Sequence, residues 1–307
     1  MKRAVNHPYV INSISELHRL LQLPKPAHPL VSVINFADVK CVDDEKMRSI
    51  VYNFYSVCTK KGYKGKVKYG QNYYDFDDGI MTFYSPGQVL TTEPAEAGDT
   101  AITGWWLVVH PDFLRSYTLA TKIKSYGFFS YAVNESLHLS DGEEVMVNSI
   151  MENIAHEHRS VIDGYSQDVI VSQIELLLNY SNRFYNRQFI TRKNASNDLL
   201  VKMETLLDAY FEQGTMQQGL PTVHYLSSQL NISANYLSDM LRSLTGQSAQ
   251  QHIQNKLIEK AKEILTTTSL SVSEVAYQLG FEHPQSFSKF FKSKTNISPL
   301  DFRHSFN

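Results

Sequence analysis

Hydrophobic positions follow one pattern in the first half of the chain and another in the second. Between Leu30 and Tyr131, short runs rich in β-branched and aromatic residues alternate with breaks that contain glycine, proline or aspartate, which is typical of strands joined by turns. Nineteen aromatic side chains fall in this region, so the aromatic excess of the chain lies in the N-terminal half, and several of these side chains belong to the short runs. Their spacing predicts a β-barrel or a β-sandwich. The predicted runs are Ser49–Val57, Lys66–Tyr69, Tyr73–Phe76, Ile80–Tyr84 and Ile102–Val109.

The pattern changes to helical spacing near Ser140. The acidic segment Ser140–Glu144 is a typical helix start, and it precedes apolar positions at Val147, Ile150, Met151 and Ile154. The next helix has its apolar stripe at Ile170, Ile174, Leu177, Leu178 and Phe184. These two helices either pack on the strand domain or form a dimer interface, and the pattern does not distinguish the two arrangements.

A short polar segment follows the helix pair. Residues Thr191–Asn197 are polar and basic and offer no apolar anchor, so we expect a linker at 191–197. This linker separates an expected N-terminal domain at 1–190 from an expected C-terminal domain at 198–307. From Leu199 onward the spacing is helical almost throughout.

The last hundred residues contain an internal repeat. At an offset of 49 positions, the repeat pairs Val223, Leu226, Ser227, Leu230 and Ile232 with Val272, Val275, Ala276, Leu279 and Phe281. At an offset of 50 positions, it pairs Leu237, Met240, Leu241, Thr245, Gly246 and Ser248 with Phe287, Phe290, Phe291, Thr295, Asn296 and Ser298. Eleven matched positions, mostly apolar or turn residues, make chance periodicity improbable.

Each copy encodes a helix, a tight turn and a second helix. In the first copy the turn is at 231–233, and the second helix is expected to bury Leu237, Met240, Leu241 and Leu244. In the second copy, Phe287, Phe290 and Phe291 are the expected anchors. A continuous helix marked by Ile253, Leu257, Ala261 and Ile264 is expected to join the two copies.

Turn and cap residues support these helix boundaries. Gly246 and Asn296 stand where a helix ends in the left-handed region. Ser271 and Glu274 have capping-box spacing, and Pro284 suits a first helical position. The repeat therefore predicts two helix-turn-helix units, a motif that places its second helix in the DNA major groove. The main alternative is a protein-binding helical array, which needs about three or more stacked repeats, whereas this chain has two.

Composition at first argues against nucleic acid. The chain has 307 residues, 29 Lys+Arg, 31 Asp+Glu and a formal net charge of −2. The expected C-terminal domain is itself close to neutral, but residues 284–296 carry three lysines and no acid. The basic surface must therefore be local, and weak monomer binding favours a dimer.

Other compositional features indicate the compartment. The two cysteines, Cys41 and Cys58, argue against a disulfide framework and favour a reducing environment. Polar residues interrupt the N-terminus before any signal-peptide core, and no apolar run approaches membrane-spanning length. We expect a cytoplasmic protein without a membrane partner.

The second copy resembles the C-terminal signature of AraC/XylS-type transcription regulators. The similarity lies in GFEHPQSFSKFFK at 280–292 and ISPLDFR at 297–303, and the first copy fits the family's first unit through NYLSDML at 235–241. Departures are Asn296 for the usual glycine and Ser227 for the usual alanine. The resemblance implies a bacterial regulator in which a cupin-like barrel with a helix pair senses an effector and dimerises. It also implies an all-α double helix-turn-helix domain at the C-terminus.

The outward faces of the second helices are the expected reading surfaces. Gln can pair with adenine, Lys can reach guanine, and Ser can bond to either base. The expected base contacts are Gln285, Ser286 and Lys289 in the second unit, and Asn235, Tyr236, Ser238 and Asp239 in the first. The expected phosphate contacts are Arg242, Lys292 and Lys294. Asp239 either accepts from a cytosine amine or pairs with Arg242 at i,i+3.

Catalytic chemistry is not indicated. His156 and His158 lie two positions apart on an expected helix and so do not share a face, which argues against a metal pair. The segment 79–87 resembles a cupin turn, but no histidine follows it at a ligand position. We expect no enzyme activity, metal or cofactor.

A small-molecule effector in the barrel remains an expectation, and none of its residues is assigned. Its control is expected to alter promoter occupancy or contact with RNA polymerase. The aromatic residues considered for such a pocket, each more typical of core packing, are Tyr69, Tyr73, Tyr74, Phe76, Phe83, Trp105 and Trp106.

Overall fold

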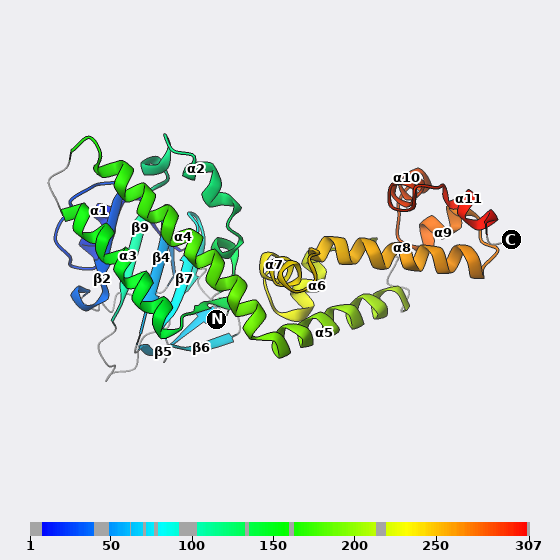
Figure 1. Cartoon of the computed structure of the whole chain (residues 1–307), viewed down its shortest axis with the longest axis horizontal. Helices are drawn as coiled ribbons and strands as arrows, with labels where there is room; N and C mark the ends of the chain where they lie inside the picture. The colour runs from blue at the N-terminus through cyan, green and yellow to red at the C-terminus, as the bar shows by residue number, and fades with distance from the viewer. Residues whose placement is uncertain are drawn as a thin grey trace, which may run out of the picture. The chain divides into compact units, whose positions relative to one another are not determined.

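The structure is a computed structural model that describes residues 8–39, 49–61, 63–69, 72–76, 79–91, 103–132, 135–159, 163–212 and 219–305. Its contacts divide the chain into two compact units, 1–188 and 189–307, and each is described by itself (Figure 1). The first unit is rich in β-sheet. The second unit is helical.

Three sheets make up the β-structure of the first unit. The largest has the order β10-β7-β4-β9-β2 with antiparallel pairing, from Leu137–His138, Ile80–Tyr84, Tyr55–Lys60, Trp105–Val109 and Val31–Asn35. A second has the order β1-β3-β8, from Tyr9–Ile11, Ser49–Tyr52 and Val89–Thr91, with β1 and β3 parallel. A hairpin joins β5 (Tyr63–Tyr69) to β6 (Asn72–Phe76). None of these sheets closes on itself within the described residues, so the sheet-rich domain is confirmed without its closure into a barrel.

The predicted strands match the structure with changes of bounds. The runs Lys66–Tyr69 and Tyr73–Phe76 lie in β5 and β6, which begin at Tyr63 and Asn72. The run Ile80–Tyr84 is confirmed as β7 with the same bounds. The run Ser49–Val57 is two strands, because the chain bends at 53–54 and the Asn53 amide donates to the Ile11 carbonyl oxygen. The last run begins at Trp105 instead of Ile102, and Ile102 lies outside the described residues.

Helices and short turns complete the first unit. The inner apolar cluster joins α1 (Ile14–Leu20) to the two larger sheets through Leu17, Ile34, Tyr52 and Trp106. Two helices, α3 (Asp141–Arg159) and α4 (Ser166–Thr191), cross the large sheet (Figure 1). Their predicted apolar stripes are buried, which confirms that the helix pair packs on the strand domain. The remaining elements are α2 (Leu119–Lys122) and the 3₁₀ turns Phe36–Asp38, Pro111–Leu114, Ile123–Ser125 and Gly127–Ser130.

The second unit is built around two similar halves. Its helices after α4 are α5 (Lys193–Glu212), α6 (Val223–Leu230), α7 (Ala234–Thr245), α8 (Ala249–Thr267), α9 (Val272–Gln278), α10 (Pro284–Thr295) and α11 (Pro299–His304). The long helix α8 joins the two halves, as the repeat predicts (Figure 1). α5 packs on α6, α7 and α8 and adds the buried residues Met203, Leu207, Tyr210 and Phe211. Residues 191–197, expected to be a linker, lie at the end of α4 and the start of α5, where Ser196 is buried.

The repeat is reproduced in hydrogen bonds. Gly246 and Asn296 both end their helices in the left-handed region, with φ of 75° and 64°. The hydroxyls of Thr245 and Thr295 donate over 2.8 Å to the carbonyl oxygens of Leu241 and Phe291. Ser248 and Ser298 cap the helices that follow. The predicted capping box at Ser271 and Glu274 and the helix start at Pro284 are also confirmed.

Two predicted core positions are corrected. Leu244 and Phe290 are half-buried, whereas both were expected to be buried anchors. Each lies at the margin of its helix's apolar stripe, so one edge of the side chain faces outward. Phe290 still packs against Phe281, with ring centroids 5.7 Å apart.

Candidate nucleic-acid interface

The first recognition helix, α7, is oriented by its buried side. Leu237, Met240 and Leu241 face the core of the second unit, and the Ser233 hydroxyl caps the helix by accepting from the Tyr236 amide over 3.2 Å. With this side fixed, the 3.6-residue period places Asn235, Ser238, Asp239 and Arg242 on the other side. Asn235 and Arg242 are exposed, and Ser238 and Asp239 are half-buried.

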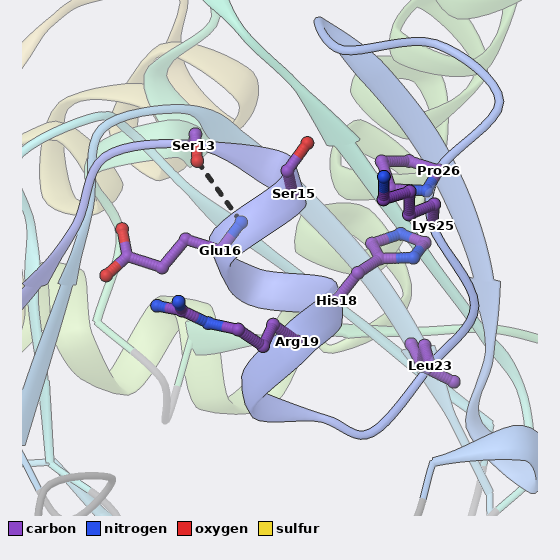
Figure 2. A pocket seen from close by; sticks show the side chains of 8 residues that line it. All are labelled: Ser13, Ser15, Glu16, His18, Arg19, Leu23, Lys25 and Pro26. Carbon is purple, nitrogen blue, oxygen red and sulfur yellow. Dashed lines mark hydrogen bonds between the residues drawn. The ribbon is translucent and has the colours of Figure 1, made fainter.

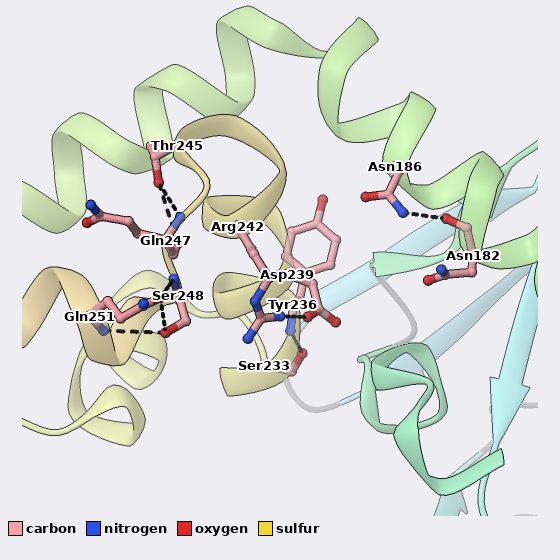
Figure 3. Close-up of polar contacts among 10 residues, drawn as sticks. All are labelled: Asn182, Asn186, Ser233, Tyr236, Asp239, Arg242, Thr245, Gln247, Ser248 and Gln251. Atoms are coloured by element: carbon pink, nitrogen blue, oxygen red, sulfur yellow. Dashed lines mark hydrogen bonds and ion pairs between the residues drawn. The ribbon is translucent and has the colours of Figure 1, made fainter. Parts of the chain in front are cut away.

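The charges on this outer face neutralise each other. Arg242 Nη1 donates to Asp239 Oδ1 over 2.6 Å, and the two side chains are 56% and 31% exposed (Figure 3). This confirms the i,i+3 pairing that the sequence offered as one of two roles for Asp239. α7 therefore presents polar groups with little net charge.

Tyr236 lies at the flank of the same face. Its ring packs edge-on against Phe189, with centroids 5.2 Å apart and an interplanar angle of 76°. Phe189 is almost fully buried, and its carbonyl oxygen accepts from the Ser196 hydroxyl over 3.1 Å. Tyr236 is thus in contact with the segment that precedes α5, a contact the sequence analysis did not foresee.

The second recognition helix, α10, differs in its electrostatics. Phe287 and Phe291 are fully buried and fix its inner side. Gln285, Ser286, Lys289, Lys292 and Lys294 are all exposed, as predicted. No carboxylate in the described part of the chain forms an ion pair with any of these three lysines. α10 therefore presents uncompensated positive charge next to groups that can read bases.

Backbone contacts hold the second helix-turn-helix motif, α9 and α10, in place. Gly280, in the turn between α9 and α10, has φ of +89°, and a Cβ there would lie 2.7 Å from the Gly219 carbonyl oxygen. Arg303 Nε donates over 3.0 Å to the Leu265 carbonyl oxygen, which ties α11 to the last turns of α8. The first contact restricts the turn that leads into α10, and the second holds the helix that follows α10.

The sequence analysis missed two further outward positions. Ser243 and Ser293 follow Asp239 and Lys289 by one helical turn and are paired by the same 50-residue offset. Ser293 is exposed and Ser243 is half-buried. The helical period, extended by one turn, is the signal that identifies them.

Of the aromatic residues considered for an effector pocket, Phe83, Trp105 and Trp106 have side chains within the described part. Phe83 and Trp106 are buried in the core, and the Trp106 indole donates to the Ser56 hydroxyl. The side chains of Tyr69, Tyr73, Tyr74 and Phe76 lie outside the described part, and Trp105 is half-buried.

A surface pocket of about 680 Å³ lies elsewhere, beside α1 (Figure 2). Its cations are Arg19 and Lys25 and its carboxylate is Glu16, which accepts from the Tyr9 hydroxyl and the Asn12 amide over 2.8 and 3.0 Å. The other lining residues are Ser13, Ser15, His18, Leu23 and Pro26.

The two histidines of the His-x-His segment do not form a metal site in the described residues. His158 Nε2 donates over 3.0 Å to the Val31 carbonyl oxygen, and burial lowers the pKa of His158. Across the described ranges, no group of three potential ligands is placed to hold a metal ion. No helix within those ranges has the length and apolar character that a membrane span requires.

Comparisons with known proteins show what the second unit is similar to. A family model described as a helix-turn-helix domain matches residues 226–305. The Bacillus subtilis protein "Uncharacterized HTH-type transcriptional regulator YfiF" is 28% identical over 174 residues, 55% of this chain and 52% of that protein. The Escherichia coli "HTH-type transcriptional activator RhaS" is 25% identical over 138 residues, 45% of each chain.

A solved structure extends the comparison. The C-terminal domain of the two-component response regulator yesN from Fusobacterium nucleatum is 35% identical, covering 33% of this chain and 96% of that one, with a TM-score of 0.29. The chain spans about half the length of the curated relatives. Together with the signature at 280–303, these matches show that residues 226–305 are a helix-turn-helix domain of the AraC/XylS type.

Proposed function

We propose that this protein regulates transcription by reading two successive major-groove segments of double-stranded DNA with α7 and α10. The observation that carries the proposal is the duplicated unit, in which each second helix buries one side and exposes a polar side. Two such helices on one face of DNA would read segments about one helical turn apart. The proposed base contacts are Asn235, Tyr236, Ser238, Asp239, Gln285, Ser286 and Lys289.

The two helices are proposed to contribute differently. Gln285 suits adenine and Lys289 suits guanine, so α10 supplies both sequence reading and charge. Lys292 and Lys294 are proposed phosphate contacts, as is Arg242. Because Asp239 neutralises Arg242, α7 is proposed to contribute selectivity more than attraction.

The first unit is proposed to control the second. We propose that its sheets belong to a cupin-like barrel that takes a small-molecule effector, and that the effector changes promoter occupancy or contact with RNA polymerase. The chain order of sheet domain, helix pair and DNA-binding domain supports this proposal. We also propose a homodimer, because a near-neutral DNA-binding domain gains affinity by binding twice. The proposed role is that of a cytoplasmic regulator without catalytic activity.

A double variant tests the DNA-reading role. Gln285→Ala with Lys289→Ala removes two exposed side chains from α10 and leaves Phe287 and Phe291 in the core. With a DNA fragment selected by the wild-type protein, we expect the preference for that fragment over unrelated DNA to disappear, while the helical circular dichroism stays unchanged. Unchanged preference would exclude α10 as the reading helix.

A further inference from the structure

The two recognition helices differ in how they are held. The 50-residue offset pairs Tyr236 of α7 with Ser286 of α10. Ser286 is exposed, and the second motif (α9 and α10) forms the same helix-turn-helix without an aromatic residue there. The motif itself therefore does not require an aromatic ring at this position, and the ring of Tyr236 needs another explanation.

Its ring contact supplies one. Tyr236 packs edge-on on Phe189, an arrangement that aromatic pairs favour. Phe189 belongs to neither helix of the motif. It lies in the last turns of α4, a single helix from Ser166 to Thr191, and it is 2% exposed.

Phe189 lies near the junction of α4 and α5, and a hydrogen bond fixes this junction. The Ser196 side chain, 5% exposed, donates from α5 back to the Phe189 carbonyl oxygen and so ties the end of α4 to the start of α5. α5 in turn packs on α6 and α7. The ring pair thus joins α7 to the junction of α4 and α5. No described residue outside the second motif forms a ring contact with the reading face of α10.

We infer that the Phe189–Tyr236 ring pair is a positioning contact that ties the first recognition helix to the end of α4. The placement of α7 on DNA then depends on the end of α4 at Phe189, which belongs to the same compact unit as α7. This inference rests on the proposed DNA-reading function. It makes Phe189 and the Tyr236 ring positioning residues, whatever the Tyr236 hydroxyl contacts on DNA.

Nuclease protection with the full-length protein tests the inference one DNA segment at a time. Tyr236→Ser introduces the residue that the second motif carries at the equivalent position, so the first motif is expected to fold. We expect the segment read by α7 to need about tenfold more protein for protection, with the segment read by α10 unchanged. Tyr236→Phe keeps the ring and removes only the hydroxyl that is proposed to contact a base, so its protection of the α7 segment is the reference for the loss in Tyr236→Ser.

Phe189→Leu separates positioning from direct contact with DNA. It keeps apolar bulk at a buried site but removes the ring, and we expect the same selective loss as for Tyr236→Ser. The double variant should be no weaker than Tyr236→Ser alone, because both substitutions remove the same ring contact. Full protection by Phe189→Leu, or a Tyr236→Ser variant that protects the α7 segment as well as Tyr236→Phe does, would overturn the inference. A wild-type protein that protects no DNA would instead contradict the proposed function.

Discussion

Asp239 and Lys289 occupy equivalent positions in the two copies, and their opposite charges make the two recognition helices electrostatically unequal. Asp239 is held by Arg242, whereas Lys289 and Lys292 have no acidic partner among the residues that the structure covers. The attraction for the DNA backbone is therefore expected to come mainly from α10. Single charge changes can measure this difference.

Lys292→Ala removes one proposed phosphate contact. We expect weaker binding to every DNA sequence, and a slope of log affinity against log salt that is smaller by about one. Asp239→Asn releases Arg242 from its ion pair and is expected to increase both the non-specific affinity and the slope. Equal slopes for the wild type and both variants, measured by fluorescence anisotropy, would contradict this assignment of charges.

Gly280 is required by its backbone and by its surroundings. A side chain there would be strained at φ of +89° and would meet the Gly219 carbonyl oxygen. We expect Gly280→Ala to lower the free energy of unfolding of the second unit by about 3 kcal/mol. Gly246→Asn is the matched control, because Gly246 has open space around its Cα and the second copy uses Asn296 there.

The two units can be observed separately in this experiment. Both tryptophans, Trp105 and Trp106, lie in the first unit, so their fluorescence reports on that unit. In urea, Gly280→Ala should shift the part of the helical circular dichroism change that belongs to the second unit to lower concentration, and it should leave the fluorescence transition in place. A wild-type circular dichroism transition would show that the turn tolerates a side chain.

At the scale of elements, the sequence predicts what is local. Helix caps and the left-handed helix ends at Gly246 and Asn296 follow short-range rules, and β7 has its predicted bounds. The helix at 193–212 is not predicted at its start, because polar residues there carry no periodic apolar signal. Ser196 is buried, and its hydroxyl donates to the Phe189 carbonyl oxygen. No sequence period reveals this contact.

Long-range pairing is the part that sequence reasoning does not reach. β1 pairs in parallel with β3, and Tyr9 lies opposite Ile50. Nothing in either run specifies that partner, so sheet order and closure do not follow from strand spacing alone. The contact of Tyr236 with Phe189 is missed for the same reason, since the two residues lie far apart along the chain.

A half-buried histidine links α3 to the edge of the large sheet and predicts a pH dependence. His158 donates to the Val31 carbonyl oxygen of β2. Burial lowers its pKa below the ordinary value of 6.5, an effect that the nearby His28, His18 and Arg159 reinforce and the Val31 bond opposes. Burial also lowers the pKa of His28. Protonation therefore favours the unfolded chain, so the stability of the first unit is full above about pH 6.5 and falls as the pH is lowered.

Urea unfolding followed by tryptophan fluorescence checks this dependence. The midpoint should be lower at pH 5.5 than at pH 7.5. His158→Gln retains a donor for Val31 but does not titrate, so its midpoint should change less between the two pH values. A midpoint that is equal at both pH values, or higher at pH 5.5, would contradict the argument.

At the scale of the whole molecule, the net charge of −2 conceals the basic segment at 284–296, which contains α10. A near-neutral chain has little general attraction for DNA, so its affinity is expected to depend on α10 and on binding as a dimer. Sedimentation in the concentration range of DNA binding is expected to show a dimer. A monomer that binds the selected DNA as tightly as the dimer does would contradict this role for dimerisation.

The central claim is that two unequal helices read two adjacent DNA segments. Nuclease protection of a selected fragment, with the wild type and the Gln285→Ala, Lys289→Ala variant side by side, tests it most directly. The account predicts two protected segments about one helical turn apart for each bound chain, with protection at the selected site lost in the variant. A single protected segment, or protection that the variant leaves unchanged, would contradict it.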